Sequence, residues 1–165
     1  MLASNPSFVN AVKNALESLY EAEIFAGKAE NHSLAFNRRF WMKDGSVLTN
    51  PGKLNPEIVG PESVIDPEIP FFIVKQDGMD RLIVANISNH TDTIGDEMVS
   101  ADWPGRMERA IQDHYGYDIP VMTLIGCQGN INHFNVKTPG SQTGYEEACR
   151  IGKAYAAVIL SAMYQ

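Results

Sequence analysis

"IPFFIVKQDGMDRLIVANIS", residues 69–88, contains two apolar runs separated by the pair Asp77-Gly78. An Asp-Gly pair between two strand-forming runs is typical of a tight β-hairpin. Each run is continuously apolar rather than alternating, which is typical of strands that are covered on both faces of a sheet. The sequence therefore predicts a central hairpin with these buried residues: Phe71, Phe72, Ile73, Val74, Leu82, Ile83 and Val84.

Three helices are predicted from apolar residues that recur at helical spacing. The first covers residues 5–27, with Asn5 as its cap, and its apolar side chains are expected to pack on one face. The second covers residues 102–116 and is capped by Asp102. The third opens with a capping box at residue 143 and continues to the C-terminus.

Two further segments complete the prediction. Residues 119–126 form another apolar strand. Residues 37–70 carry five prolines and three glycines, which predicts a long surface excursion without lasting regular structure. The order of elements predicts a single domain, residues 1–165, of the α/β or α+β class, with a mixed β-sheet and flanking helices in a layered sandwich.

The composition excludes several classes of protein. With 44% apolar and 20% charged residues, and neither an eighteen-residue apolar run nor a signal-peptide pattern, we expect a soluble protein without a membrane segment. A net charge of −7 argues against nucleic acid as a partner, because the only basic pair is Arg38-Arg39. Cys127 and Cys149 lack metal or redox spacing, which favours a reducing, cytoplasmic location for this chain.

Two polar loops, residues 88–102 and 126–138, each follow an apolar strand. If the two strands run in the same direction, both loops lie at one edge of the sheet, where α/β proteins bind ligands. His90, Asp92, Asp102 and His133 could then converge as nitrogen and oxygen ligands of zinc. The alternatives are a loop histidine bonded to the backbone and, for Asp102, a helix cap.

Other residues in or near these loops have both functional and structural interpretations. Cys127 could be a nucleophile or a small buried thiol, and no nucleophile-elbow motif surrounds it. Gly126 and Gly129 could expose backbone N–H groups to an anion or only form a turn. Arg38 and Arg39 could hold a carboxylate or phosphate, or form a solvated basic pair.

Five segments occur in the order seen in one enzyme family: "NRRF", "NPG", "DPEIPFFIV", "ANISNHTDTIGDEMVSADWPG" and "LIGCQGNINHFN". Over most of residues 31–135, the chain resembles the catalytic domain of neutral/alkaline ceramidases and their bacterial relatives. The resemblance implies that His90 is a zinc ligand and that Asn37 and Arg38 line the same site. The family's Ser-x-Asp-x-x-Gly element falls on Ser100, Asp102 and Gly105.

The nucleophile motif of that family, G-D-[IV]-S-P-N, falls on residues 129–134 and is altered here. Asn132 replaces the serine and Asn130 the aspartate. An amide cannot attack a carbonyl as a serine hydroxyl does, but a metal-activated water could, with Asn132 or His133 stabilising the developing charge. Some relatives resemble this chain in having "GNINH" or "GDINH" at this point.

The family's other zinc ligands come from segments before and after this region, so the chain resembles the central part of a larger catalytic domain. Its zinc site is then incomplete, and a full-length parent could be secreted. The resemblance implies a metal-dependent hydrolase of an amide or related ester bond in a small or lipid-like substrate. The predicted catalytic or substrate-binding residues are Asn132, His133 and Arg38. The predicted metal-binding residues are His90, Asp92 and Asp102. A non-catalytic ligand-binding module of the same fold is the alternative, and a metal-dependent carbohydrate-active or phosphoester hydrolase is a further alternative within the enzyme class.

Overall fold

The structure is a computed structural model that describes residues 6–95, 97 and 99–163. These residues contain three helices, α1 (Pro6–Glu17), α2 (Asp102–Tyr115) and α3 (Tyr145–Met163). The predicted cap of the first helix, Asn5, lies outside the described residues. None of the three helices is both long enough and apolar enough to cross a membrane.

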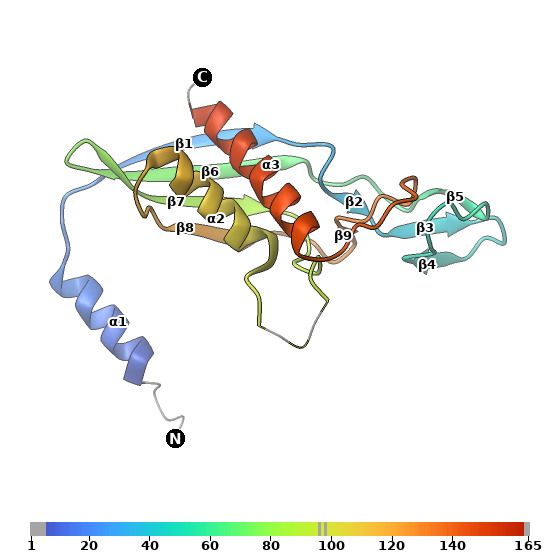
Figure 1. Cartoon of the computed structure of the whole chain (residues 1–165), viewed down its shortest axis with the longest axis horizontal. Coiled ribbons are helices and arrows are strands. Elements are labelled where there is room, and N and C mark those ends of the chain that lie inside the picture. The colour runs from blue at the N-terminus through green and yellow to red at the C-terminus, as the bar shows by residue number, and fades with distance from the viewer. Residues whose placement is uncertain (1–5, 96, 98, 164–165) are drawn as a thin grey trace.

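A four-stranded sheet forms the centre of the fold, in the order β1-β6-β7-β8. Its strands are β1 (Glu23–Glu30), β6 (Glu68–Gln76), β7 (Met79–Ile87) and β8 (Val121–Ile125). β1 and β7 are antiparallel to β6, whereas β8 is parallel to β7. Figure 1 shows α2 and α3 side by side over one face of this sheet. The predicted mixed sheet with flanking helices is confirmed, in the form of an α+β sandwich.

Asp77 and Gly78 connect β6 to β7 with backbone φ angles of 51° and 73°. A positive φ at both central residues is what a two-residue hairpin turn needs to match the twist of its strands. Gln76 and Met79 pair directly across this turn. The predicted hairpin is therefore confirmed.

Only one face of the hairpin is covered by the described residues. Along β6, Ile69, Phe71 and Ile73 are buried, but Phe72 between them is exposed. The expectation that both faces are covered is wrong in part for the described residues: Phe72 is exposed, whereas its cross-strand neighbour Val84 is buried as predicted. The physical reason is that α2 and α3 pack on the same side of the sheet, so no described layer covers the other side.

The core lies between the covered face and the two helices. Its largest buried residues are Ile83 and Ile87 from β7, Trp103, Met107 and Ile111 from α2, and Ile151, Tyr155 and Ile159 from α3. Gly152 allows α3 to approach α2 closely, because a Cβ atom there would lie 2.6 Å from the backbone nitrogen of Met107. The apolar side chains that recur at helical spacing along α2 and α3 thus face the sheet.

The first helix is shorter than predicted. α1 ends at Glu17, and residues 23–30 form β1 in register with β6 rather than a continuation of the helix. Short apolar segments fit strand and helix spacing alike, and pairing with β6 determines the outcome here. The expected packing of α1 is also not seen, because its apolar side chains Phe8, Val12 and Leu16 are exposed.

The proline-rich segment contains short strands, so the prediction that it lacks regular structure is wrong in part. β3 (Arg39–Met42) pairs with β4 (Val47–Thr49) and with β5 (Ile58–Pro61) in a separate sheet. β2 (Phe36–Asn37) pairs instead with β9 (Ile131–Asn132). Strands this short fit between the prolines. The β2–β9 pairing places Asn37 and Arg38 beside the loop that follows β8.

Candidate functional site

The two polar loops lie together at one edge of the central sheet. β7 and β8 are parallel, with Ile87 paired to Ile125, so their carboxyl ends meet. The Gly126 N–H donates to the Ile87 carbonyl at 3.1 Å, directly where the loops leave the strands. A Cβ at position 126 would lie 2.6 Å from Ser88 Oγ, so glycine permits this close approach. The expectation that both loops share one edge is confirmed.

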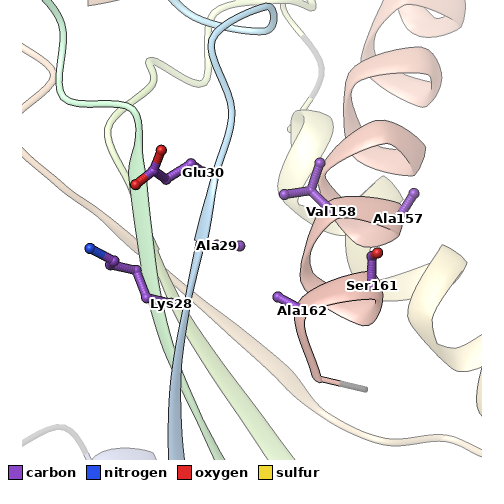
Figure 2. Close-up of a pocket in the computed structure, with 7 residues that line it drawn as sticks. All are labelled: Lys28, Ala29, Glu30, Ala157, Val158, Ser161 and Ala162. Atoms are coloured by element: carbon purple, nitrogen blue, oxygen red, sulfur yellow. The ribbon is translucent and has the colours of Figure 1, made fainter. Parts of the chain in front are cut away.

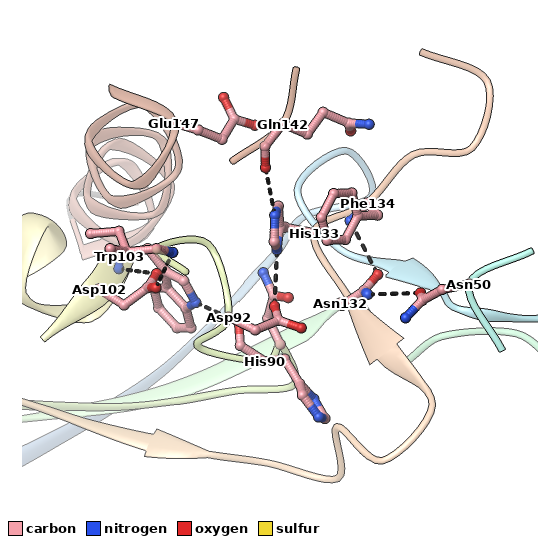
Figure 3. Close-up of polar contacts among 12 residues, drawn as sticks. Asn50, His90, Asp92, Asp102, Trp103, Asn132, His133, Phe134, Gln142 and Glu147 are labelled. Atoms are coloured by element: carbon pink, nitrogen blue, oxygen red, sulfur yellow. Dashed lines mark hydrogen bonds and ion pairs between the residues drawn. The ribbon is translucent and has the colours of Figure 1, made fainter. Parts of the chain in front are cut away.

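His133 is bonded through both of its ring nitrogens, to the first polar loop and to the segment that precedes α3. Nδ1 lies 3.1 Å from Oδ1 of Asp92, and Nε2 lies 2.6 Å from the carbonyl oxygen of Gln142 (Figure 3). The residue is only 1% exposed. This arrangement leaves neither ring nitrogen free to bind a metal or a substrate.

The side chain of Asn132 is also fully used inside the protein. It is completely buried, its Nδ2 donates to Asn50 Oδ1 at 3.1 Å, and its Oδ1 accepts from the Phe134 N–H at 3.1 Å. Asn50 adopts a left-handed backbone conformation with a φ of 51°. Asn132 therefore fixes the geometry of the loop after β9 and does not face solvent.

Asp102 holds the start of α2. Its Oδ1 accepts from the Trp103 N–H at 2.6 Å, and its Oδ2 accepts from the Ile94 N–H at 2.8 Å. The preceding residue, Ala101, makes no side-chain cap. Asp102 is buried and both of its oxygens accept from backbone N–H groups, so it ties residue 94 to the start of α2 and has no oxygen directed to a metal. The predicted helix cap is not seen in its usual form, because Asp102 bonds the next residue rather than the second or third N–H of the helix.

Three other polar side chains at this edge remain partly exposed: Arg38, His90 and Asp92. The Asp92 side chain is 38% exposed. Burial raises the pKa of this carboxyl, but the hydrogen bond with His133 and the charges of His133, His90 and Arg38 outweigh burial and lower the pKa below its usual value. The carboxylate is therefore the negative centre of a group of basic side chains.

His90 is held through its own backbone carbonyl, and Arg38 is held by its side chain on the backbone carbonyl of another residue. The carbonyl oxygen of His90 accepts from Trp103 Nε1 at 2.9 Å, and its imidazole points away from His133 (Figure 3). Its Nδ1 is buried without a hydrogen-bond partner among the described residues. The guanidinium of Arg38 donates to the Gly129 carbonyl from Nε at 3.1 Å and from Nη2 at 2.8 Å.

The described residues fit part of a zinc site but not a complete one. Nowhere in the described part of the chain do three His, Cys, Asp or Glu side chains come close enough to hold a metal ion. Zinc takes at least three protein ligands. With His133 and Asp102 engaged elsewhere, His90 and Asp92 are the remaining donors of the predicted set.

A cavity of about 320 Å³ lies beside the Asn50–Asn132 contact and is lined by Asn50, Gly52, Lys53, Phe134 and Val136. Most of its wall is apolar. A larger cavity of about 560 Å³ lies between β1 and the C-terminal half of α3, at the opposite end of that helix from the polar loops (Figure 2). The larger cavity has no histidine, and its Lys28 is paired with Glu68 at 2.6 Å. The polar loops and the smaller cavity form the candidate site.

Sequence reasoning missed several members of this site. Asn50 and Gln142 reach Asn132 and His133 only because segments distant in sequence meet. Ser63 likewise accepts from Asn37 and Asn130 through its Oγ, at 2.8 and 3.0 Å. The only available signal was the turn-forming Asn-Pro-Gly context of Asn50. Cys127, for which a buried thiol was one prediction, is exposed.

The chain matches no protein-family model, and no curated protein sequence is similar to it. Its structure is similar to the crystal structure of neutral ceramidase from Pseudomonas aeruginosa, with a TM-score of 0.68 and 18% identity over 95% of this chain. A structure described as ceramidase complexed with C2 is similar too, with a TM-score of 0.67, 17% identity and 93% coverage. This chain spans about a quarter of those chains, 25% and 24% respectively. The similarity shows that the chain has a ceramidase-like fold.

Proposed function

We propose that this chain forms part of a metal-dependent hydrolase that cleaves an amide or related ester bond. The observation that supports this most strongly is the environment of His90, at the carboxyl end of β7. Its Nδ1 is one of three buried side-chain atoms in residues 89–93 without a partner among the described residues, together with Asn89 Oδ1 and Thr93 Oγ1. Buried polar atoms are normally hydrogen-bonded, so such a group indicates a missing ion, water or protein partner.

In this proposal His90 is a metal ligand and Asp92 a second donor beside it. The remaining ligands come from outside the described residues, because the described ones do not complete the site. A zinc ion held there would supply an activated water, the nucleophile that an asparagine cannot be. His133 and Asn132 act as positioning residues, since their polar atoms are already engaged.

The substrate contacts follow from the groups that remain available. Arg38 uses one edge of its guanidinium on the Gly129 carbonyl and keeps further N–H groups for an acyl oxygen. The 320 Å³ cavity beside Asn132 accommodates an apolar part of the substrate. A lipid-like amide fits both features, and the structural neighbours are ceramidases.

A non-catalytic ligand-binding module is the second candidate function. It is favoured by one specific observation, the presence of a buried and fully hydrogen-bonded asparagine at the serine position of the nucleophile motif. Under this alternative the cavity still binds an apolar ligand, but no bond is cleaved.

Hydrolysis of N-acyl amides and matched esters, by a protein that contains this chain together with the remaining metal ligands and with added zinc or a chelator, separates the two functions. We expect zinc-dependent hydrolysis that falls by about 100-fold in His90→Ala, as expected for loss of a metal ligand. The control His32→Ala, an exposed histidine in another loop, keeps full activity. Absence of hydrolysis, or equal activity in His90→Ala, would support the non-catalytic module instead.

A further inference from the structure

The uncovered side of the central sheet carries an apolar area around a buried Val84, and the Lys28–Glu68 ion pair lies on the same side at one end. We define the open face as the side chains of Ile24, Phe72, Val74, Leu82, Met122 and Leu124. Ile24 is 69% exposed and Met122 54%, and no described element lies over them. Monomeric proteins rarely leave such a contiguous apolar surface exposed, and it usually marks an interaction site.

α1 presents a second uncovered apolar surface. Phe8, Val12 and Leu16 recur every four residues on one side of the helix, and Phe8 and Leu16 are 72% and 62% exposed. Figure 1 shows α1 extending away from the sheet. A helix of twelve residues is marginally stable in water without tertiary packing. Both surfaces therefore lack the layer that would normally cover them.

We propose that two copies of this chain form a symmetric dimer in which α1 of each copy packs across the open face of the other. A helix layer on a sheet face is a standard way to bury both surfaces. The two contacts are equivalent under a two-fold axis, so the assembly closes at two chains. Because α1 leads away from its own sheet, its apolar side is available to a partner.

The dimensions of the two surfaces agree. Twelve helical residues extend about 18 Å, and four strands spaced about 4.8 Å apart are about 19 Å wide. A stable interface buries at least about 1,200 Å² in total. Because the contact occurs twice, each helix and each open face needs to bury only about 300 Å². Three large exposed side chains on α1 and six residues on the open face supply an area of this order.

Sedimentation of the native chain over a range of concentrations tests the dimer. We expect a dimer whose dissociation constant rises at least about tenfold in Leu16→Glu and in Met122→Glu, with no loss of far-ultraviolet circular dichroism beyond the signal of α1 itself. The matched control Val64→Glu, at an exposed apolar residue outside both surfaces, leaves the dimer intact. A native chain that is monomeric at all concentrations, or a dimer that tolerates both substitutions, overturns the proposal.

Disulfide trapping identifies which sheet α1 contacts. With Cys127 and Cys149 replaced by serine, a chain carrying Leu16→Cys is mixed with one carrying Met122→Cys. We expect a disulfide between these two chains under mild oxidation. If a chain carrying both substitutions instead forms only an intrachain disulfide, α1 packs on its own sheet, and the proposed packing of α1 on the partner's sheet is wrong. Neither readout depends on catalytic activity or on a bound metal.

Discussion

Two groups of polar side chains lie at the same edge of the sheet, and they differ in how much of their hydrogen-bonding capacity is used. The side chains of Asp102, Asn132 and His133 are buried, and each of their oxygen and nitrogen atoms makes a hydrogen bond. His90 and Asp92 are partly exposed and keep capacity for further partners. The first group maintains the loops, and the second is available for chemistry. Position in a motif alone does not distinguish them.

Substitution of His133 is expected to have the largest effect on stability. His133→Ala leaves the Gln142 carbonyl without its donor, removes the partner of Asp92 and opens a cavity, so we expect a loss of about 3 kcal/mol. Urea unfolding measures this loss. His32→Ala serves as the exposed control, and a change below about 1 kcal/mol in His133→Ala contradicts the assigned role.

Asp102 comes next. Asp102→Ala removes the acceptor of two backbone N–H groups, those of Ile94 and Trp103, and we expect a loss of about 2 kcal/mol. Asp102→Asn keeps one acceptor oxygen and should lose about half as much. Hydrogen exchange at these two amides provides the specific readout, because it accelerates only if the carboxylate holds them. Unchanged exchange in Asp102→Ala would show that the carboxylate does not hold these two amides.

The Asp92–His133 pair predicts a smaller, pH-dependent effect. Because the pKa of Asp92 is lowered in the folded protein, the unfolded chain binds more protons in acid. The stabilisation is therefore present above the ordinary pKa of an aspartate and is lost as pH falls through the lowered value. Unfolding free energies measured from about pH 6 to pH 2 should fall less steeply in Asp92→Asn than in the native chain. Parallel curves for the two proteins would contradict the pairing.

His90 should matter least for stability. Its imidazole makes no hydrogen bond through Nδ1 within the described residues, and its backbone carbonyl keeps the bond from Trp103 after substitution. We expect His90→Ala to change the free energy of unfolding by less than about 0.5 kcal/mol. Thermal and urea unfolding check this value. A loss comparable to that of His133→Ala would place His90 among the structural residues.

The sequence predicted those parts of the fold that depend on local signals. The Asp77-Gly78 turn and the apolar runs beside it specify the hairpin. The shared direction of β7 and β8, which places both loops at one edge, was only a condition of the prediction, because it depends on a non-local pairing. The prediction of helix for the residues of β1 is wrong, because their apolar spacing fits a helix and a strand alike and only the pairing with β6 determines the outcome. The pairing of β2 with β9 joins residues almost a hundred positions apart. Partners that depend on such non-local contacts carry no local signal.

The same limit applies to the candidate site. His90, Asp92, His133 and Arg38 were identified from residue type and motif, and the charges of the other three act on Asp92. Which of them still had free hydrogen-bonding capacity could not be predicted, because that depends on the positions of Gln142 and Gly129. Residue chemistry indicates the candidates, and only the three-dimensional contacts assign their roles.

The most direct test of the proposed function is a titration of the chain with zinc, followed by NMR of labelled histidine rings. We predict that zinc shifts the ring resonances of His90, leaves those of the exposed His32 unchanged, and has no such effect in His90→Ala. NMR detects weak binding, so a site with few ligands is still observable. If zinc leaves the His90 ring unaffected, or if His90→Ala binds zinc as tightly as the native chain, then His90 is not a metal ligand.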